Sequence, residues 1–216
     1  METEAAPGER VFSPRQAEVL EAALRELVEG GRPLTMGAVA KRAACSKETL
    51  YKWFDDRDGL LTAIVRFQAA RVQVAAVEPG RLDLASLTAR LEEFAANWLR
   101  VIASETSIAL NRVAIGQAGG GAVPLGAIVL ENGRFALGRR LKPVLEAGRA
   151  AGLIDFPESE EAFRTFFGLF ARDVQIRLLL GERLDLAPDT IRADARRAAR
   201  QFLTLYGAQP STGMPG

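Results

Sequence analysis

Between residues 46 and 54 the sequence combines cations, hydroxyls and one carboxylate with two apolar side chains at helical spacing. Leu50 and Phe54 lie four residues apart, so they fall on one face of a helix and can anchor it. The other side chains then point outward, where lysine can donate to guanine O6 and N7, and glutamate can accept from cytosine N4. The outward set is Ser46, Lys47, Glu48, Thr49, Tyr51 and Lys52. This pattern indicates contacts to DNA bases and phosphates.

Three neighbouring helices are expected to position this one. A helix begins near residue 13 with a capping pattern, and a short helix over residues 36–43 follows Thr35 as its N-cap. Ser46 caps the helix over residues 47–54, and a long helix follows from Asp56 to Val77. Two short helices braced by a helix on either side form a helix-turn-helix unit, whose second helix enters the major groove.

The stretch from residue 34 to residue 61, LTMGAVAKRAACSKETLYKWFDDRDGLL, resembles the TetR family of bacterial transcriptional regulators. The residues that carry the resemblance are Thr35, Val39, Ala40, Ser46, Thr49, Leu50, Tyr51, Phe54, Arg57, Leu60 and Leu61. The resemblance implies a homodimeric repressor that binds a palindromic operator on double-stranded DNA. It also implies that Tyr51 contacts a phosphate; packing in the core is the alternative for its ring.

Three positions depart from the family pattern. Ala44 replaces the usual glycine of the turn, so this turn either has another geometry or holds Ala44 under strain. Glu48 stands where a small residue is often found, and its alternative role is to stabilise the helix N-terminus. Arg57 keeps the charge where lysine is commoner.

The positive charge of this region is local. The chain carries a net charge of +1, and residues 1–60 hold 9 basic against 11 acidic side chains. Residues 32–57, in contrast, hold 6 basic against 3 acidic side chains, a patch sufficient to contact phosphates. Thr35 and Arg57 lie near helix N-termini, whose free amides favour phosphate. The alternative is a charged face that contacts only water.

Composition argues against most enzymes. The chain has no histidine and one cysteine, which excludes Ser–His and Cys–His nucleophiles and histidine-ligated metals. We therefore expect no catalytic residue, metal or cofactor. Cys45 is expected to fill space in the turn, with a redox-sensing thiol as the alternative. Two other classes stay open: a helical enzyme that works without histidine, and a helical adaptor that binds only protein.

The rest of the chain predicts a larger helical domain, so the fold class is all-α. Its expected helices cover residues 84–103, 104–116, 124–151, 158–180 and 188–207. The resemblance implies that this domain dimerises and senses a small molecule, and its layout is similar to the AefR-like branch. The expected ligand-binding residues are Phe94, Asn97, Trp98, Asn111 and Arg112. The expected dimer interface is formed by Phe163, Phe166, Phe167, Phe170, Val174, Ile191, Ala195 and Phe202, with an intrachain core as the alternative.

The domain organisation follows from these elements. We expect a helix-turn-helix domain over residues 11–60, a sensing and dimerisation domain over 61–208, and disordered tails at 1–10 and 209–216. The most apolar long segment, residues 163–180, carries four charges, which argues against a membrane span. No signal peptide is recognised, and we expect a cytoplasmic protein.

Overall fold

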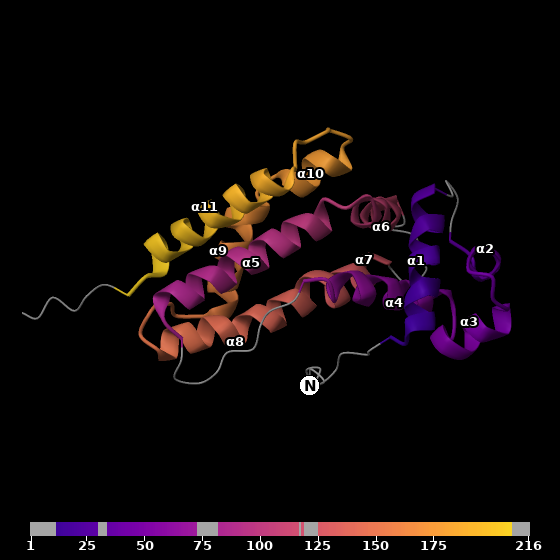
Figure 1. Ribbon diagram of the computed structural model, residues 1–216, viewed down its shortest axis with the longest axis horizontal. Helices are drawn as coiled ribbons and strands as arrows, with labels where there is room; N and C mark the ends of the chain where they lie inside the picture. The colour runs from indigo at the N-terminus through magenta and orange to yellow at the C-terminus, as the bar shows by residue number, and fades with distance from the viewer. Residues whose placement is uncertain (1–11, 30–33, 73–81, 117, 119–124, 209–216) are drawn as a thin grey trace, which may run out of the picture.

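A computed structural model describes residues 12–29, 34–72, 82–116, 118 and 125–208. All regular elements in these ranges are helices, which confirms the predicted all-α class. Figure 1 shows α1–α3 at one end of an elongated molecule, with α5, α8 and α11 running lengthwise through the other. The first elements are α1 (Pro14–Glu29), α2 (Met36–Arg42), α3 (Lys47–Phe54), α4 (Arg57–Ala69), α5 (Leu84–Ile102) and α6 (Glu105–Gly116). The others are α7 (Leu125–Val129), the π-helix η1 (Leu130–Phe135), α8 (Ala136–Ala150), α9 (Ser159–Ala171), α10 (Val174–Leu179) and α11 (Pro188–Tyr206).

An aliphatic core joins α1, α2, α3 and α4. Leu20, Val39, Leu50, Leu60 and Ile64 have no exposed surface and belong to one buried cluster. Burying a leucine or isoleucine side chain contributes about 1.5–3 kcal/mol, so this cluster fixes the angle between the two short helices. Side chains from α6 and α7 extend the same cluster, and it therefore includes more of the chain than residues 11–60.

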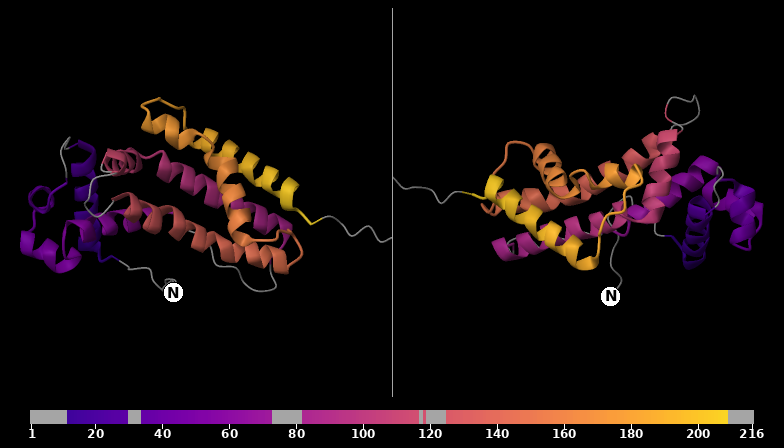
Figure 2. Two further views of the ribbon diagram at one scale, coloured as in Figure 1. Left: turned by 180° about the vertical axis from the view of Figure 1, so that it is seen from behind. Right: turned by 90° about the horizontal axis from the view of Figure 1, so that it is seen from above.

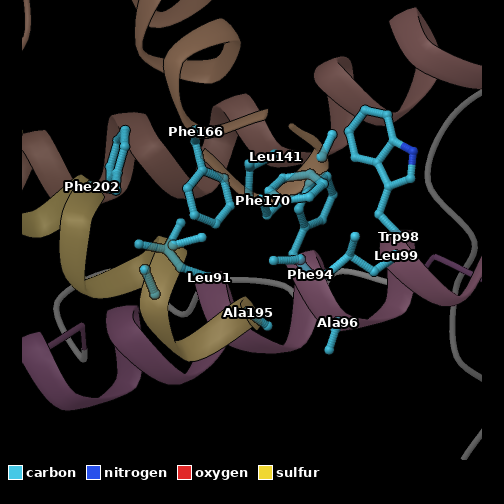
Figure 3. Packing of buried hydrophobic residues seen from close by; sticks show 14 of the residues in the cluster. Leu91, Phe94, Ala96, Trp98, Leu99, Leu141, Phe166, Phe170, Ala195 and Phe202 are labelled. Atoms are coloured by element: carbon cyan, nitrogen blue, oxygen red, sulfur yellow. The ribbon is translucent and has the colours of Figure 1, made fainter. Parts of the chain in front are cut away.

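A second core, built largely of aromatic rings, lies among α5, α8, α9 and α11 (Figure 3). The rings of Phe94 and Trp98 meet edge to face, with centroids 5.5 Å apart, and Phe166 meets Phe202 at 5.2 Å. We call this set the aromatic core; its members are Phe94, Trp98, Phe163, Phe166, Phe167, Phe170 and Phe202. Edge-to-face pairs add about 0.5–1.5 kcal/mol to the burial of their area.

The predicted dimer residues lie almost entirely within this core. Seven of the eight are buried inside a single chain, and Phe167 is half-buried. A side chain with no exposed surface cannot bury more of it against a second copy. The intrachain alternative therefore describes these side chains. The seven buried residues are Phe163, Phe166, Phe170, Val174, Ile191, Ala195 and Phe202.

Two predicted helices are shorter than expected. The helix predicted over residues 56–77 ends at Ala69. There the Arg140 guanidinium donates hydrogen bonds to the carbonyls of Ala69 and Val72, at 2.6 and 3.1 Å. The final part of that predicted helix lies outside the described residues. The helix predicted over 158–180 is divided into α9 and α10 because Arg172 takes a positive φ of 40°.

The helix predicted over 124–151 is helical throughout its described residues, but one turn of it is irregular. Residues 130–135 form the π-helix η1 between α7 and α8. Two further predictions, the disordered tails at 1–10 and 209–216, lie outside the described residues. Among the described helices, none is long and apolar enough to span a membrane.

The two cores meet where α6, α7 and η1 pack against α1 and α4. Figure 1 shows α4 extending from the end that carries α2 and α3 towards α8, and both views of Figure 2 show the indigo N-terminal helices at one end and the yellow end of α11 at the other. Leu110 of α6 and Leu125 of α7 are buried in the aliphatic core, and Arg66 Nε of α4 donates to Asn132 Oδ1 of η1 at 2.7 Å. The helix that follows α3 is therefore held directly by the second half of the molecule.

Candidate nucleic-acid interface

The turn between α2 and α3 has the geometry of a helix-turn-helix unit. Thr35 caps α2 as predicted, and its hydroxyl accepts from the Ala38 N–H at 3.2 Å. Ala44 has a φ of 49°, so the strained alternative describes this position. Such a left-handed conformation costs a residue with a Cβ about 1–2 kcal/mol. Arg15 of α1 braces the turn, since its guanidinium donates to the Ala43 carbonyl at 2.9 Å.

Helix α3 is anchored as the sequence predicts. Ser46 is its N-cap and accepts from the Thr49 N–H at 3.1 Å, and the two hydroxyls lie 3.1 Å apart. Leu50 and Phe54 are buried. Because both ends of its inner face are fixed, α3 presents the opposite face to solvent with a defined orientation.

The outward face of α3 carries the predicted polar side chains. Lys47, Glu48 and Lys52 are exposed, and Thr49 is half-buried beside the cap. Tyr51 exposes 51% of its surface, so packing in the core does not account for its ring. These residues share one accessible surface, which is the geometry that base and phosphate contacts require.

Lys47 is placed by a residue that the sequence interpretation overlooked. A Cβ at Gly37 of α2 would lie 3.1 Å from Lys47 Cε, so the lysine stem lies against the glycine. The missing side chain thus makes room for a predicted base-contacting residue. A glycine within a short helix, where it is unfavourable, was the available signal.

Arg57 joins the start of α4 to the start of α2. Its Nε donates to the Leu34 carbonyl at 2.9 Å, and its guanidinium lies 3.6 Å from the carboxylate of Asp58. This bond brings Arg57 and Thr35 to the same side of the unit. Arg57 therefore also has a structural contact, because its hydrogen bond to Leu34 holds the start of α2, and its contact with phosphate stays a prediction.

Glu48 stays ionised more readily than an ordinary glutamate. Its own backbone N–H, followed by the Ser46 hydroxyl, lowers the pKa of this carboxyl below its usual value. An ionised carboxylate at the start of α3 repels phosphate but can accept from a cytosine amine. The same interactions also stabilise the helix N-terminus, so both roles stated for Glu48 remain compatible with the structure.

The local basic patch is smaller than the sequence indicates. Arg42 donates to Glu26 at 2.7 Å and to Glu29 at 2.6 Å, and these two hydrogen bonds raise its pKa further. Its charge is balanced by α1. Within the part of the chain that the structure describes, the cations of this patch that form no salt bridge are Lys41, Lys47 and Lys52, and Lys47 helps to lower the pKa of Glu48 beside it. Lys41, exposed near the end of α2, was not among the predicted contact residues.

The predicted ligand-binding residues occupy three separate places. Phe94 and Trp98 are buried in the aromatic core (Figure 3), and Asn97 lies on the more exposed side of α5, where it accepts from Arg100. Asn111 donates to the Ser107 carbonyl within α6. Arg112 donates to the carbonyls of Leu178 and Leu179 at 3.1 and 3.2 Å, and so ties α6 to α10.

Cys45 is half-buried beside the aliphatic core, in the turn that precedes α3. The described residues contain no cluster of three side chains that could hold a metal ion.

A short, anchored helix with an exposed polar face, held by a capped neighbour across a tight turn, defines a helix-turn-helix DNA-binding protein. Comparison with known protein families supports this class in both halves of the chain. Residues 19–64 match the family of bacterial regulatory proteins named tetR, and residues 89–208 match the AefR-like transcriptional repressor C-terminal domain. The chain belongs to the TetR family of transcriptional regulators, and this is a family of regulators rather than enzymes.

Solved structures share the whole architecture. A TetR transcriptional regulator from Agrobacterium tumefaciens is 47% identical, with a TM-score of 0.79, over 92% of this chain and 97% of that one. The flavonoid-responsive regulator FrrA is 25% identical, with a TM-score of 0.66, over 91% of this chain and 98% of that one.

A curated relative resembles only part of the chain. An uncharacterised HTH-type transcriptional regulator from Mycobacterium tuberculosis is 41% identical over 63 residues, 26% of this chain. The match spans 31% of the length of that relative.

Proposed function

We propose that this regulator is a homodimeric repressor that acts in the cytoplasm on a palindromic operator in double-stranded DNA. The observation that carries the proposal is the exposed face of α3, on which Lys47 and Lys52 form no salt bridge and Tyr51 exposes half of its surface. Lys47 and Glu48 contact base edges, and Ser46, Thr49 and Lys52 support or contact the backbone. Thr35, Tyr51 and Arg57 contact phosphates.

Phosphate contact makes DNA binding depend on salt. Each neutralised phosphate contributes a slope of about −0.9 to the logarithm of affinity against the logarithm of salt concentration. Fluorescence anisotropy of a labelled duplex from the DNA upstream of the protein's own gene, titrated at several salt concentrations, measures that slope. The proposal expects a slope of at least 3 in magnitude, as an estimate of about four contacts. A slope near zero would count against it and favour an adaptor.

The outer faces of α9 and α11 are the proposed dimer surface. At Gly168, on the outer side of α9, an added Cβ would meet no atom within 4 Å, so a second helix can approach closely there. On α11, Leu205 exposes 62% of its surface. The buried aromatic rings beneath these faces give the surface a rigid base. Family membership supports dimerisation. A palindromic site is read by two recognition helices about 34–36 Å apart, and a dimer supplies both of them.

Sedimentation velocity of glycine variants tests the dimer surface. Gly168→Arg places a bulky charge on the proposed surface without a clash inside the chain, and we expect it to yield monomers. Gly116→Arg is the matched control, since a Cβ at Gly116 in α6 also meets no atom. Dimers of Gly168→Arg as stable as those of the control would place the interface elsewhere.

A small molecule bound in the second half of the molecule is proposed to weaken operator binding. A flavonoid-responsive regulator among the relatives supports a ligand-responsive function. The half of the chain after α4 is the proposed sensing and dimerisation domain, and α4 is the link to α3. Phe94 and Trp98, which lie in the aromatic core, remain proposed neighbours of the ligand, whereas Asn97, Asn111 and Arg112 lie in other places and make contacts within the protein. Coupling of about 1–3 kcal/mol between the two sites would change DNA affinity about 5- to 150-fold.

A further inference from the structure

Gly37 is the second residue of α2, at a position where the backbone does not require glycine. Among the described residues, the glycines with a positive φ are Gly152 and Gly181, so Gly37 has a backbone conformation that other residues also adopt. Glycine is unfavourable within a helix, because it loses more conformational freedom on folding than any other residue. An alanine at this position would favour α2, so the glycine requires another explanation.

The space beside Gly37 is occupied by the side chain of Lys47, the first residue of α3. A Cβ built at Gly37 would lie 3.1 Å from Lys47 Cε and 3.6 Å from Lys47 Nζ. Outside α2 itself, no other described residue comes within 4 Å of that Cβ. Because both atoms belong to the far end of the lysine, its stem crosses from the start of α3 to the first turn of α2.

The two helices at this crossing are fixed, whereas the lysine is not. Val39 of α2 and Leu50 of α3 have no exposed surface and belong to the same buried cluster. Lys47 is exposed, and its ammonium is carried on a flexible four-carbon stem. A side chain added at Gly37 would therefore displace the lysine rather than the helices.

The next residue along α3, Glu48, is held elsewhere. Its carboxylate accepts from its own backbone N–H and from the Ser46 hydroxyl at the cap of α3. Consecutive residues of a helix do not face each other, and Lys47 and Glu48 form no salt bridge. The ammonium on the α2 side and the carboxylate at the cap are therefore presented separately, and each can contact a different base.

We propose that Gly37 is a specificity-determining residue of this regulator, which leaves its space to Lys47 and so fixes where the ammonium meets the base edges. The inference rests on the proposed function, in which α3 reads the operator. Lysine donates to guanine O6 and N7, and such a hydrogen bond weakens steeply when its geometry is lost. A larger residue in place of Gly37 therefore changes the preference for guanine at one base pair.

Binding selections on randomised sites with the full-length protein test the proposal. Gly37→Ala should lower the preference for guanine at one operator position at least about fivefold, the lower end of the effect of a lost base contact. Its affinity for random DNA should stay within about twofold of the wild type, because phosphate contacts are unchanged. Gly126→Ala, also at the second residue of a short helix, is the matched control, since its Cβ would meet no atom within 4 Å.

A double-mutant cycle shows whether Gly37 acts through Lys47. The guanine preference is already lost in Lys47→Ala, so the addition of Gly37→Ala should change it less than about twofold. An unchanged preference in the Gly37→Ala single variant overturns the inference. Gly37→Ala that weakens all DNA sequences alike, and equally so in the Lys47→Ala protein, overturns it too, because the glycine then lies against DNA itself.

Thermal unfolding separates an effect on base reading from an effect on folding. Gly37→Ala should unfold at the wild-type temperature or above, because alanine favours a helix and the displaced lysine is exposed. A lower unfolding temperature with loss of all DNA binding would make Gly37 structural and overturn the inference. Wild-type protein that binds no DNA overturns the proposed function instead.

Discussion

The polar face of α3 and the buried side of α4 carry their polar groups in opposite ways. On α3, Lys47, Glu48 and Lys52 are exposed on a regular helix whose other face is buried. On α4, Gln68 is buried and neither polar atom of its amide has a hydrogen-bond partner. A surface that contacts a large charged polymer is recognised by exposure, whereas a buried polar group is recognised only once the packing around it is known.

The largest expected effect concerns the aromatic core. Phe166→Ala should lower the free energy of unfolding by about 3–5 kcal/mol, because Phe166 has no exposed surface and meets Phe170 and Phe202 at 5.2 Å. Urea denaturation followed by circular dichroism measures this change. Phe135→Ala is the control, because Phe135 exposes 42% of its surface, and it should cost less than about 1 kcal/mol. Equal losses in both variants would mean that the ring cluster is not the main source of stability.

The next effect compares two cations of the DNA-binding unit. Lys47→Ala should reduce operator affinity and change the base preference by about 1–3 kcal/mol at one position. Arg42→Ala should change DNA affinity much less, since Glu26 and Glu29 already hold that guanidinium. Binding selections on randomised sites, carried out with both variants, measure the affinity and the base preference of each. An Arg42→Ala variant that loses more affinity than Lys47→Ala would contradict the assignment of α3 as the reading helix.

A smaller effect concerns the strained turn. Ala44→Gly should raise the free energy of unfolding by about 1 kcal/mol, because glycine adopts a φ of 49° without the clash of a Cβ. Thermal unfolding checks the prediction, and Ala38→Gly, inside α2, should be destabilising by about 1 kcal/mol instead. Two destabilised variants would show that the turn relaxes away from the left-handed conformation.

The smallest effect is a dependence on pH. The pKa of Glu48 is lowered, first by its own backbone N–H, and that of Asp83 by the Ser86 hydroxyl. A lowered pKa in the folded state stabilises it above the unfolded pKa, and this contribution is lost as the pH falls through the folded value. We expect Glu48→Gln and Asp83→Asn each to reduce the loss of stability below about pH 4. Urea denaturation at pH 7 and pH 3 measures the difference, and parallel losses in wild type and variants would show that neither carboxyl contributes.

The DNA-binding unit could be predicted from the sequence because its signals are local. The Thr35 and Ser46 side chains each accept a hydrogen bond from the N–H three residues later in the chain. Leu50 and Phe54 anchor α3 from positions four residues apart. The bonds from Arg42 to α1 and from Arg57 to Leu34 were not predictable, since they join residues 13 to 23 positions apart in the sequence.

In the second half of the molecule, periodicity predicted the helices but not their partners. An apolar stripe has the same pattern whether it faces its own chain or a second copy, so Phe163 and Phe202 were assigned to a dimer interface and lie in the intrachain core. The π-turn at 130–135 and the break at Arg172 interrupt stretches whose periodicity predicts continuous helices. The missing partners of Gln68 depend on which helix covers α4, and no local pattern contains that information.

Protection mapping of the DNA upstream of the protein's own gene tests the central claim most directly. Two copies of α3 on one dimer should protect two half-sites related by a two-fold axis, with centres about 34–36 Å apart or a multiple of that distance. Lys47→Ala should weaken both half-sites equally. Protection of a single half-site, or none at protein concentrations where dimers form, would contradict the account of this chain as a dimeric DNA-binding repressor.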